Sequence, residues 1–275
     1  MDPIVKEILA ELERKCFRYD RAKFAHVRTI EDFHRIWGNE HGGYVAPDDI
    51  VVAPVEPARE DMYPRIMNLR ANVNGVQTVY KCIYIPGCAW NDKKIFREYI
   101  KRGNRILLKE LAAENTINIC LTPNFGGKST IMAMALSPIF NSHRAKLVYS
   151  IAGDKKKVAL TRTDRGVYYD KSEGKFGLAG SVRTLNPRAI NVIMGGTFSA
   201  GEVIAIALKS ISDKVKVTFI GKRTGGATTN IGWKKLSNGG FIEYPIGDMA
   251  DCRGNTYPDG VPVDIELPSE PEEII

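Results

Sequence analysis

The stretch INVIMGGTFSAGEVIAIALK, residues 190–209, joins two apolar runs through a turn rich in small residues. The first run ends at Gly195-Gly196 and has the length and the β-branched content of a buried strand. The second run begins near Ser199 and is apolar almost all round, which predicts a buried helix. Further strand and helix patterns alternate along the chain, so the sequence predicts an α/β fold.

Ser199, at the junction of the two runs, has two interpretations. As a nucleophile, it would project its hydroxyl from a sharp strand-to-helix turn, with the amide of Ala200 pointing out of the helix N-terminus. As an N-cap, it would only accept a hydrogen bond from the first turn, which is a very common use of serine. Glu202, in that first turn, suits the helix dipole in either case. The local sequence leaves both interpretations open.

A second glycine loop, LTPNFGGKST, occupies residues 121–130 and ends like a nucleotide-binding loop. The nucleotide pattern requires a glycine five residues before Gly127, where this chain has Thr122. Pro123 also removes one backbone amide from the loop. Nucleotide hydrolysis is therefore disfavoured. Because the loop follows an apolar strand and precedes a helical pattern, its amides still suit an anion, including a transient one.

A nucleophilic serine needs a base, and the chain has four histidines. His26 and His34 lie in helical patterns, and His143 follows a helix end. His41 lies in the glycine-containing stretch NEHGGYVAP, a loop that could aim a side chain at a cleft. It is the candidate base, although a surface loop histidine is the more common outcome of such a pattern.

The composition excludes several classes of function. An apolar content of 44% and a charged content of 26% are ordinary for a globular protein. The basic residues behind the net charge of +7 are spread out, which disfavours nucleic-acid binding. There is no apolar run of about eighteen residues that could span a membrane. Five scattered cysteines without CxxC spacing predict free thiols, no zinc site and a cytoplasmic location.

A helical N-terminal segment and one core domain are expected along the chain. Residues 1–45 predict a helical N-terminal segment that begins with an amphipathic helix, and residues 46–275 predict the core domain. Residues 50–75 contain three prolines and no clean period, so we expect a covering loop region there. Residues 93–115 predict a long helix interrupted at Gly103.

Five segments, in order, resemble those of the C-terminal processing (tail-specific) serine peptidases. They are GNEHGGYVAPDD, INICLTPNFGGKST, INVIMGGTFSAGEVIAIALK, VTFIGKRTGGATTN and GNTYPDGVPVDIELP. The TFSAGE part is highly specific, and the ordered set carries more weight than any one segment. The resemblance implies a ClpP/crotonase-like core of ββα units and the hydrolysis of peptide bonds. It therefore favours the nucleophile over the N-cap at Ser199.

The same resemblance implies roles for the two glycine loops. Ser199 would attack the scissile carbonyl, and the Ala200 amide would bind the oxyanion together with the amide of Gly126 or Gly127. Asn124 is expected to set the shape of the loop. No metal or organic cofactor is implied. The expected partner is a polypeptide substrate, with neither nucleic acid nor membrane, and a homo-oligomer is left open.

The family has a serine–lysine branch and a tricorn-like serine–histidine–acid branch. Ala227 stands here at the place of the lysine, and Lys222 lies on the wrong side of the turn. His41 fits the second branch and is the expected general base.

The chain departs from the family pattern at the acid. An ungapped match places Tyr257 there, so Asp259 is the candidate that would orient the base, with Asp251 upstream. The arginine of the family's DLR motif is also missing, since residues 120–122 read CLT. These departures leave a second possibility, an inactive family member that binds a ligand or a peptide. No segment resembles a PDZ domain, so substrate capture is expected from the N-terminal helices or from residues 45–75.

Overall fold

The computed structural model divides the chain into two compact units, each with an apolar core of its own. The smaller unit comprises Met1–Val55, Ser150–Lys156 and Thr229–Asp248, and the larger comprises Glu56–Tyr149, Lys157–Thr228 and Met249–Ile275. The structure describes residues 1–16, 18–37, 43–47, 60–73, 75–88, 92–140, 146–163, 166–169, 181–269 and 271–274. Within these ranges, no helix is long and apolar enough to cross a membrane.

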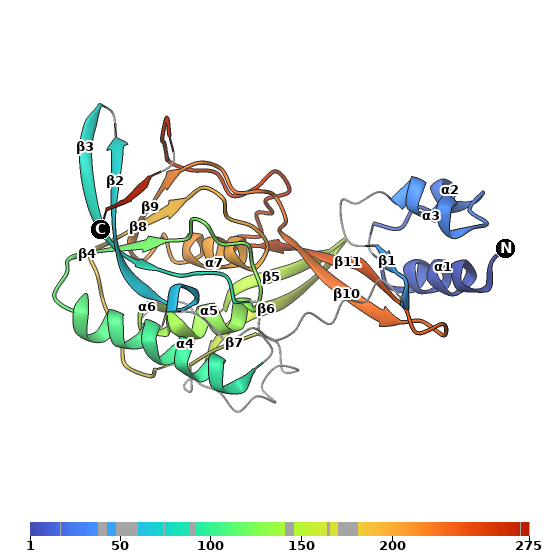
Figure 1. Cartoon of the computed structure of the whole chain (residues 1–275), viewed down its shortest axis with the longest axis horizontal. Coiled ribbons are helices and arrows are strands. Elements are labelled where there is room, and N and C mark those ends of the chain that lie inside the picture. The colour runs from blue at the N-terminus through green and yellow to red at the C-terminus, as the bar shows by residue number, and fades with distance from the viewer. Residues whose placement is uncertain are drawn as a thin grey trace. The chain divides into compact units, whose positions relative to one another are not determined.

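A seven-stranded sheet organises the larger unit (Figure 1). Its strands are β2 (Arg65–Val73), β3 (Val76–Tyr84), β4 (Thr116–Cys120), β8 (Ala189–Met194), β9 (Lys216–Gly221), β12 (Ile265–Glu266) and β13 (Glu272–Ile274). They lie in the order β12-β9-β8-β4-β3-β2-β13. Neighbours from β12 to β3 are parallel, whereas β2 and β13 pair antiparallel. Because parallel strands need crossover connections, helices alternate with them, and the α/β prediction is confirmed.

Helices of the larger unit share one core with this sheet. They are α4 (Lys93–Arg105), α5 (Ser129–Ala135), α6 (Ser137–Phe140) and α7 (Ala200–Lys209), with a 3-10 turn η2 (Glu60–Met62) and a π-helical turn η3 (Ile106–Glu110). Tyr99 of α4 and Ile204 of α7 are fully buried together with Ile119 and Ile190 of the central strands. Helix α7 is buried from its first residue through Leu208, as its sequence predicts.

Two local expectations are wrong. Strand β2 occupies part of the predicted loop region 50–75, since its side chains alternate in burial and it pairs along its whole length with β3. Helix α4 passes through Gly103 without a break. A Cβ built on Gly103 would lie 2.7 Å from the Cβ of Ala135, so this glycine allows α4 and α5 to approach closely.

The second sheet contains the strands of the smaller unit. Its strands are β1 (Tyr44–Val45), β5 (Lys146–Ala152), β6 (Lys155–Thr163), β7 (Gly166–Tyr169), β10 (Thr229–Lys235) and β11 (Phe241–Ala250). Their order is β1-β11-β5-β6-β7, and β10 pairs with β11. Strand β1 and most of the β10–β11 hairpin belong to the smaller unit.

The remaining helices complete the smaller unit. They are α1 (Pro3–Lys15), α2 (Arg21–Phe24) and α3 (Ile30–Trp37). The predicted amphipathic helix is confirmed, because Val5, Ile8 and Leu12 of α1 are fully buried. They pack with Phe33 of α3 and Tyr244 of β11 into the core of this unit.

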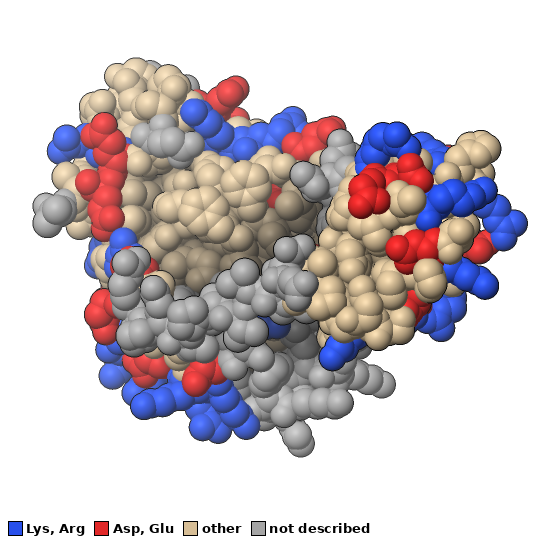
Figure 2. All heavy atoms as spheres, turned by 45° about the vertical axis from the view of Figure 1, so that its right-hand side comes forward, with Lys and Arg blue, Asp and Glu red and all other residues tan. Residues whose placement is uncertain are grey.

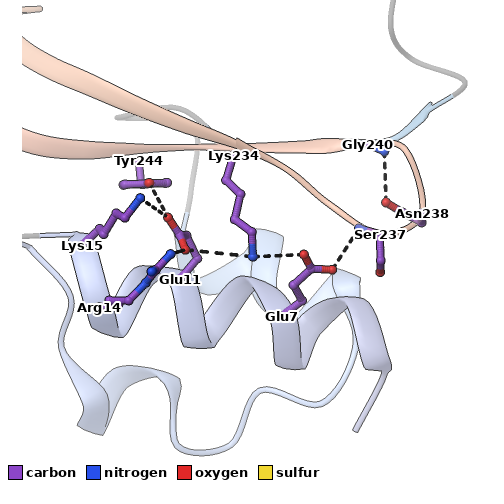
Figure 3. A network of polar contacts seen from close by, with 9 residues as sticks. All are labelled: Glu7, Glu11, Arg14, Lys15, Lys234, Ser237, Asn238, Gly240 and Tyr244. Atoms are coloured by element: carbon purple, nitrogen blue, oxygen red, sulfur yellow. Dashed lines mark hydrogen bonds and ion pairs between the residues drawn. The ribbon is translucent and has the colours of Figure 1, made fainter.

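Glu11 joins α1 to the β10–β11 hairpin (Figure 3). This glutamate is only 2% exposed and accepts a hydrogen bond of 2.7 Å from the hydroxyl of Tyr244. Its carboxylate also pairs with Arg14 and, at 3.2 Å, with Lys15. Burial by itself would raise the pKa of Glu11, but the hydrogen bonds outweigh it and lower the pKa to about 2. The carboxylate is therefore ionised in the folded protein.

Candidate active site

Ser199 lies at a sharp junction between the end of β8 and the start of α7. Among the described residues it is the only non-glycine residue with a positive φ, at φ 51° and ψ −119°. An ordinary N-cap has an extended backbone, and a conformation like this one costs about 1–3 kcal/mol. Ser199 is also exposed. Ser199 is the N-cap of α7, but its strained, exposed backbone differs from that of an ordinary cap and is typical of a nucleophile elbow.

Asn124 joins the glycine loop after β4 to this junction. Its side chain is fully buried, donates to the carbonyl of Ile85 at 2.8 Å, and accepts from the amide of Gly126 at 3.0 Å. Its main chain donates to the carbonyl of Gly196 at 2.9 Å and accepts from the amide of Phe198 at 2.8 Å. These bonds confirm that Asn124 sets the shape of the loop.

Gly126 lies directly against Ser199. A Cβ built on Gly126 would be 2.7 Å from the Cβ of Ser199, 3.1 Å from its Oγ and 3.3 Å from the amide nitrogen of Ala200. Both loop glycines have a positive φ, 99° at Gly126 and 114° at Gly127. The amide of Gly126 is bound by Asn124. Within the described part of the chain, the amides of Gly127 and Ala200 have no acceptor.

The buried carboxylate of Glu202 joins the junction to the turn after β9. One oxygen accepts from the amide of Ser199 at 2.9 Å. The other accepts from the hydroxyl of Thr224 at 2.5 Å and from the amide of Gly226 at 2.8 Å. Glu202 therefore holds the backbone of Ser199 and the turn in one arrangement. The sequence analysis missed this role, although the spacing Ser-x-x-Glu of a capping box indicates the bond to Ser199.

The closing segment of the chain lies against the same turn. The amide of Thr224 donates to the carbonyl of Val261 at 3.2 Å, and the amide of Val261 donates to the Thr224 hydroxyl at 2.7 Å. Asp259, the candidate acid, is part of this closing segment and is exposed. The structure thus brings together four of the five segments that resemble the peptidase family.

Asp251, the acid upstream of Asp259, is hydrogen-bonded to residues of the closing segment. It accepts from the hydroxyl of Tyr257 at 2.7 Å and from the side chain of Asn255 at 3.0 Å. Burial by itself would raise the pKa of Asp251, but the hydrogen bonds from Asn255 and Tyr257 outweigh it and lower the pKa. Burial and the bond to Asp251 in turn raise the pKa of Tyr257. Tyr257, at the place of the family's acid, is therefore a neutral donor to a second acid.

The candidate base His41 lies outside the described residues, as does His143. The two other histidines are described in the smaller unit, where His26 follows α2 and His34 lies in α3. The described residues of the larger unit, which contains Ser199, therefore include no histidine.

Cys88 is a buried cysteine whose main chain is hydrogen-bonded to the glycine loop. Its amide donates to the carbonyl of Gly126 at 2.9 Å, and its carbonyl accepts from the amide of Lys128 at 2.7 Å. Burial raises the pKa of Cys88 to about 12, with Lys128 opposing the shift. Because a thiolate is the reactive form of cysteine, this residue is unsuited to act as the nucleophile in place of Ser199.

Known proteins share the fold and part of the sequence. The family model for peptidase family S41 matches residues 108–267. Among solved structures, a lipoprotein from Streptococcus agalactiae is similar with a TM-score of 0.63 and 18% identity, over 98% of this chain and 93% of that chain. The photosystem II D1 C-terminal processing protease has a TM-score of 0.48 and 17% identity, over 80% of this chain and 49% of that chain. A search of curated proteins finds no match.

The likeness to the lipoprotein supports the fold alone, since the identity is low. The family model reaches further because it spans more than half of the chain and includes Asn124, Gly126, Ser199 and Glu202. These are the residues that form the strained junction and hold it in place. The chain therefore belongs to peptidase family S41.

Proposed function

We propose that this protein is a serine endopeptidase that cleaves polypeptides with Ser199 as its nucleophile. The observation that carries the proposal is the backbone of Ser199, which is exposed, strained and packed against Gly126 with no room for another side chain. Membership of a peptidase family supports peptide-bond hydrolysis in general.

In the proposed reaction, the Oγ of Ser199 bonds to the scissile carbonyl carbon while its proton passes to a base. The carbonyl oxygen becomes an anion, and the amides of Ala200 and Gly127 stabilise it at the start of two helices. We assign the second donor to Gly127 because Asn124 binds the amide of Gly126. When the C–N bond breaks, the base returns the proton to the leaving amine. Water then gives a proton to the base and bonds to the ester carbon; the bond from that carbon to Oγ breaks, the base returns the proton to Oγ, and the acid product leaves.

We assign the base to His41 and the orienting acid to Asp259, on the sequence resemblance. Ala227 replaces the lysine of the alternative branch, and Lys222 is exposed on the other side of the turn. Asp251 is a poorer acid for this role because its carboxylate already accepts several hydrogen bonds within its own segment. The reaction uses only protein groups and water.

A fluorophosphonate probe tests the nucleophile directly. The wild-type protein should be labelled at Ser199, and Ser199→Ala should not be labelled. Ser237→Ala removes another exposed serine and should be labelled like the wild type. Folded wild-type protein that stays unlabelled contradicts the proposal. An apolar ligand that co-purifies with such a protein would instead identify an inactive, ligand-binding family member.

The same probe distinguishes the two branches. His41→Ala should slow the labelling of Ser199 by about a thousandfold or more, because the serine loses its base. Lys222→Ala should change the rate little. If Lys222→Ala abolishes labelling and His41→Ala does not, the serine–lysine branch is correct.

A further inference from the structure

Two exposed phenylalanines flank the reacting groups. Phe125 directly precedes Gly126 and is 75% exposed, and Phe198 directly precedes Ser199 and is 41% exposed. Their rings stack, with centroids 6.4 Å apart and an angle of 19° between the planes. Large apolar side chains that stay in water at a site of this kind are usually there to contact another molecule.

The backbone of both phenylalanines is held firmly. The amide of Phe198 donates to the carbonyl of buried Asn124, and this bond joins the two loops that carry the rings. The ring of Phe198 packs on Gly225, where any Cβ would overlap it. Gly225 is itself bound through its amide to the carbonyl of Thr197 at 3.0 Å. The rings are therefore displayed by a rigid support, which lowers the entropy lost when a ligand binds.

The loop residues next to the two rings in sequence are uncharged. Residues 121–127 and 195–201 contain no Asp, Glu, Lys or Arg. On one face of the larger unit, side chains other than Asp, Glu, Lys and Arg form a broad area (Figure 2). An apolar side chain placed on the rings would gain from burial, whereas a charged one would lose its hydration.

We propose that Phe125 and Phe198 bind a bulky apolar side chain of the substrate, on a residue next to the scissile bond. This inference rests on the proposed peptidase activity and adds the substrate class, polypeptides with an aromatic or large aliphatic residue at the cleavage site. Phe125 is bonded to Gly126 of the glycine loop, and Phe198 is bonded to Ser199. Both rings therefore lie next to the groups that would react.

The test compares three peptides that differ at one position beside the scissile bond, with Phe, Ala or Asp there. Wild-type protein should cleave the Phe peptide with a kcat/KM about 10- to 100-fold above that of the Ala peptide, and the Asp peptide more slowly still. Phe125→Ala should bring the ratio of Phe to Ala near one. Because Phe125 is mostly exposed, this variant should fold normally.

Two further variants complete the test. Phe198→Leu keeps an apolar side chain on Gly225 and should lower the same ratio only in part. Val79→Ala removes an exposed apolar side chain from β3 and should leave the ratio as in the wild type. An unchanged ratio in Phe125→Ala, or an equal loss in Val79→Ala, overturns the inference.

Binding to Ser199→Ala separates this inference from the proposed activity. Fluorescence anisotropy with the same peptides should show tighter binding of the Phe peptide, and the preference should vanish in the double variant Ser199→Ala/Phe125→Ala. If the wild type resists the fluorophosphonate but this preference is present, the catalytic proposal fails and the apolar site stands. If the wild type is labelled and no preference exists, the apolar site fails alone.

Discussion

Ser199 adopts a backbone conformation that few serines have, and its neighbours make this conformation possible. Gly126 leaves the space that a side chain would occupy, and Glu202 binds the amide of Ser199. Asn124 is hydrogen-bonded to both loops, through its side chain and through its main chain. Strain of this kind persists only where the surroundings determine the conformation several times over.

Gly126→Ala should strongly slow the labelling of Ser199, because the new methyl group would lie 2.7 Å from the Cβ of Ser199. We expect a rate at least about a hundredfold below the wild type, measured with the fluorophosphonate probe. Gly75→Ala is the matched control, since Gly75 also has a positive φ, 84°, but has no atom within 4 Å of a Cβ. It should lower the free energy of unfolding by about 1 kcal/mol and leave labelling intact. Equal labelling of both variants would contradict this account.

Glu202→Gln should both destabilise the protein and slow the labelling of Ser199. Its three donors are the amides of Ser199 and Gly226 and the hydroxyl of Thr224, and an amide group offers them one oxygen instead of two. A donor left without an acceptor costs about 1–3 kcal/mol, which denaturant unfolding would measure.

The control for this substitution is Glu266→Gln, the same change at an exposed position in β12. It should alter neither the free energy of unfolding nor the labelling rate. If Glu202→Gln unfolds like the wild type and is labelled at the same rate, the carboxylate does not position the nucleophile.

At the scale of elements, periodicity identified the strand–turn–helix unit of β8 and α7 correctly, because both are buried and apolar throughout. It failed where a neighbour decides the outcome. The β2 region has prolines nearby, and only pairing with β3 shows it as a strand. Gly103 is a helix breaker by propensity, but the packing of α4 on α5 requires it.

Glu11→Gln should weaken the contact between α1 and the β10–β11 hairpin. The pKa of Glu11 is lowered from 4.5 to about 2, so its stabilising effect is complete above about pH 4.5 and is lost as the pH falls toward 2. A shift of this size corresponds to about 3 kcal/mol. The variant should lose roughly that free energy of unfolding at neutral pH and should show a flatter pH dependence between 4.5 and 2.

Urea unfolding across this pH range, with hydrogen exchange of the α1 amides, measures the effect. Glu13→Gln is the control on the same helix, because the Glu13 side chain is 48% exposed and pairs with the exposed Arg21. It should change the free energy of unfolding by less than about 1 kcal/mol. A Glu11→Gln variant whose stability follows pH as the wild type does would show that the network in Figure 3 adds nothing.

At the scale of the whole molecule, each unit is built from segments far apart in the chain. The smaller unit combines Met1–Val55 with Ser150–Lys156 and Thr229–Asp248, whereas the sequence pattern predicts only a helical segment over residues 1–45. The apolar face of α1 shows that the helix must pack against another element, but no local sequence pattern identifies that element. The partner is the β10–β11 hairpin, which contributes Leu236, Ile242 and Tyr244 to the core.

The sequence by itself determined the α/β class and placed Ser199 and the glycine loop at strand-to-helix junctions, because these depend on the pattern of residues close by in the chain. Only the tertiary structure decided how the segments meet. It shows a hydrogen bond from the amide of Gly126 to Asn124, one from the hydroxyl of Thr224 to Glu202, and one from the hydroxyl of Tyr257 to Asp251. These are hydrogen bonds between groups whose separation along the chain carries no periodic signal, and burial makes each of them obligatory.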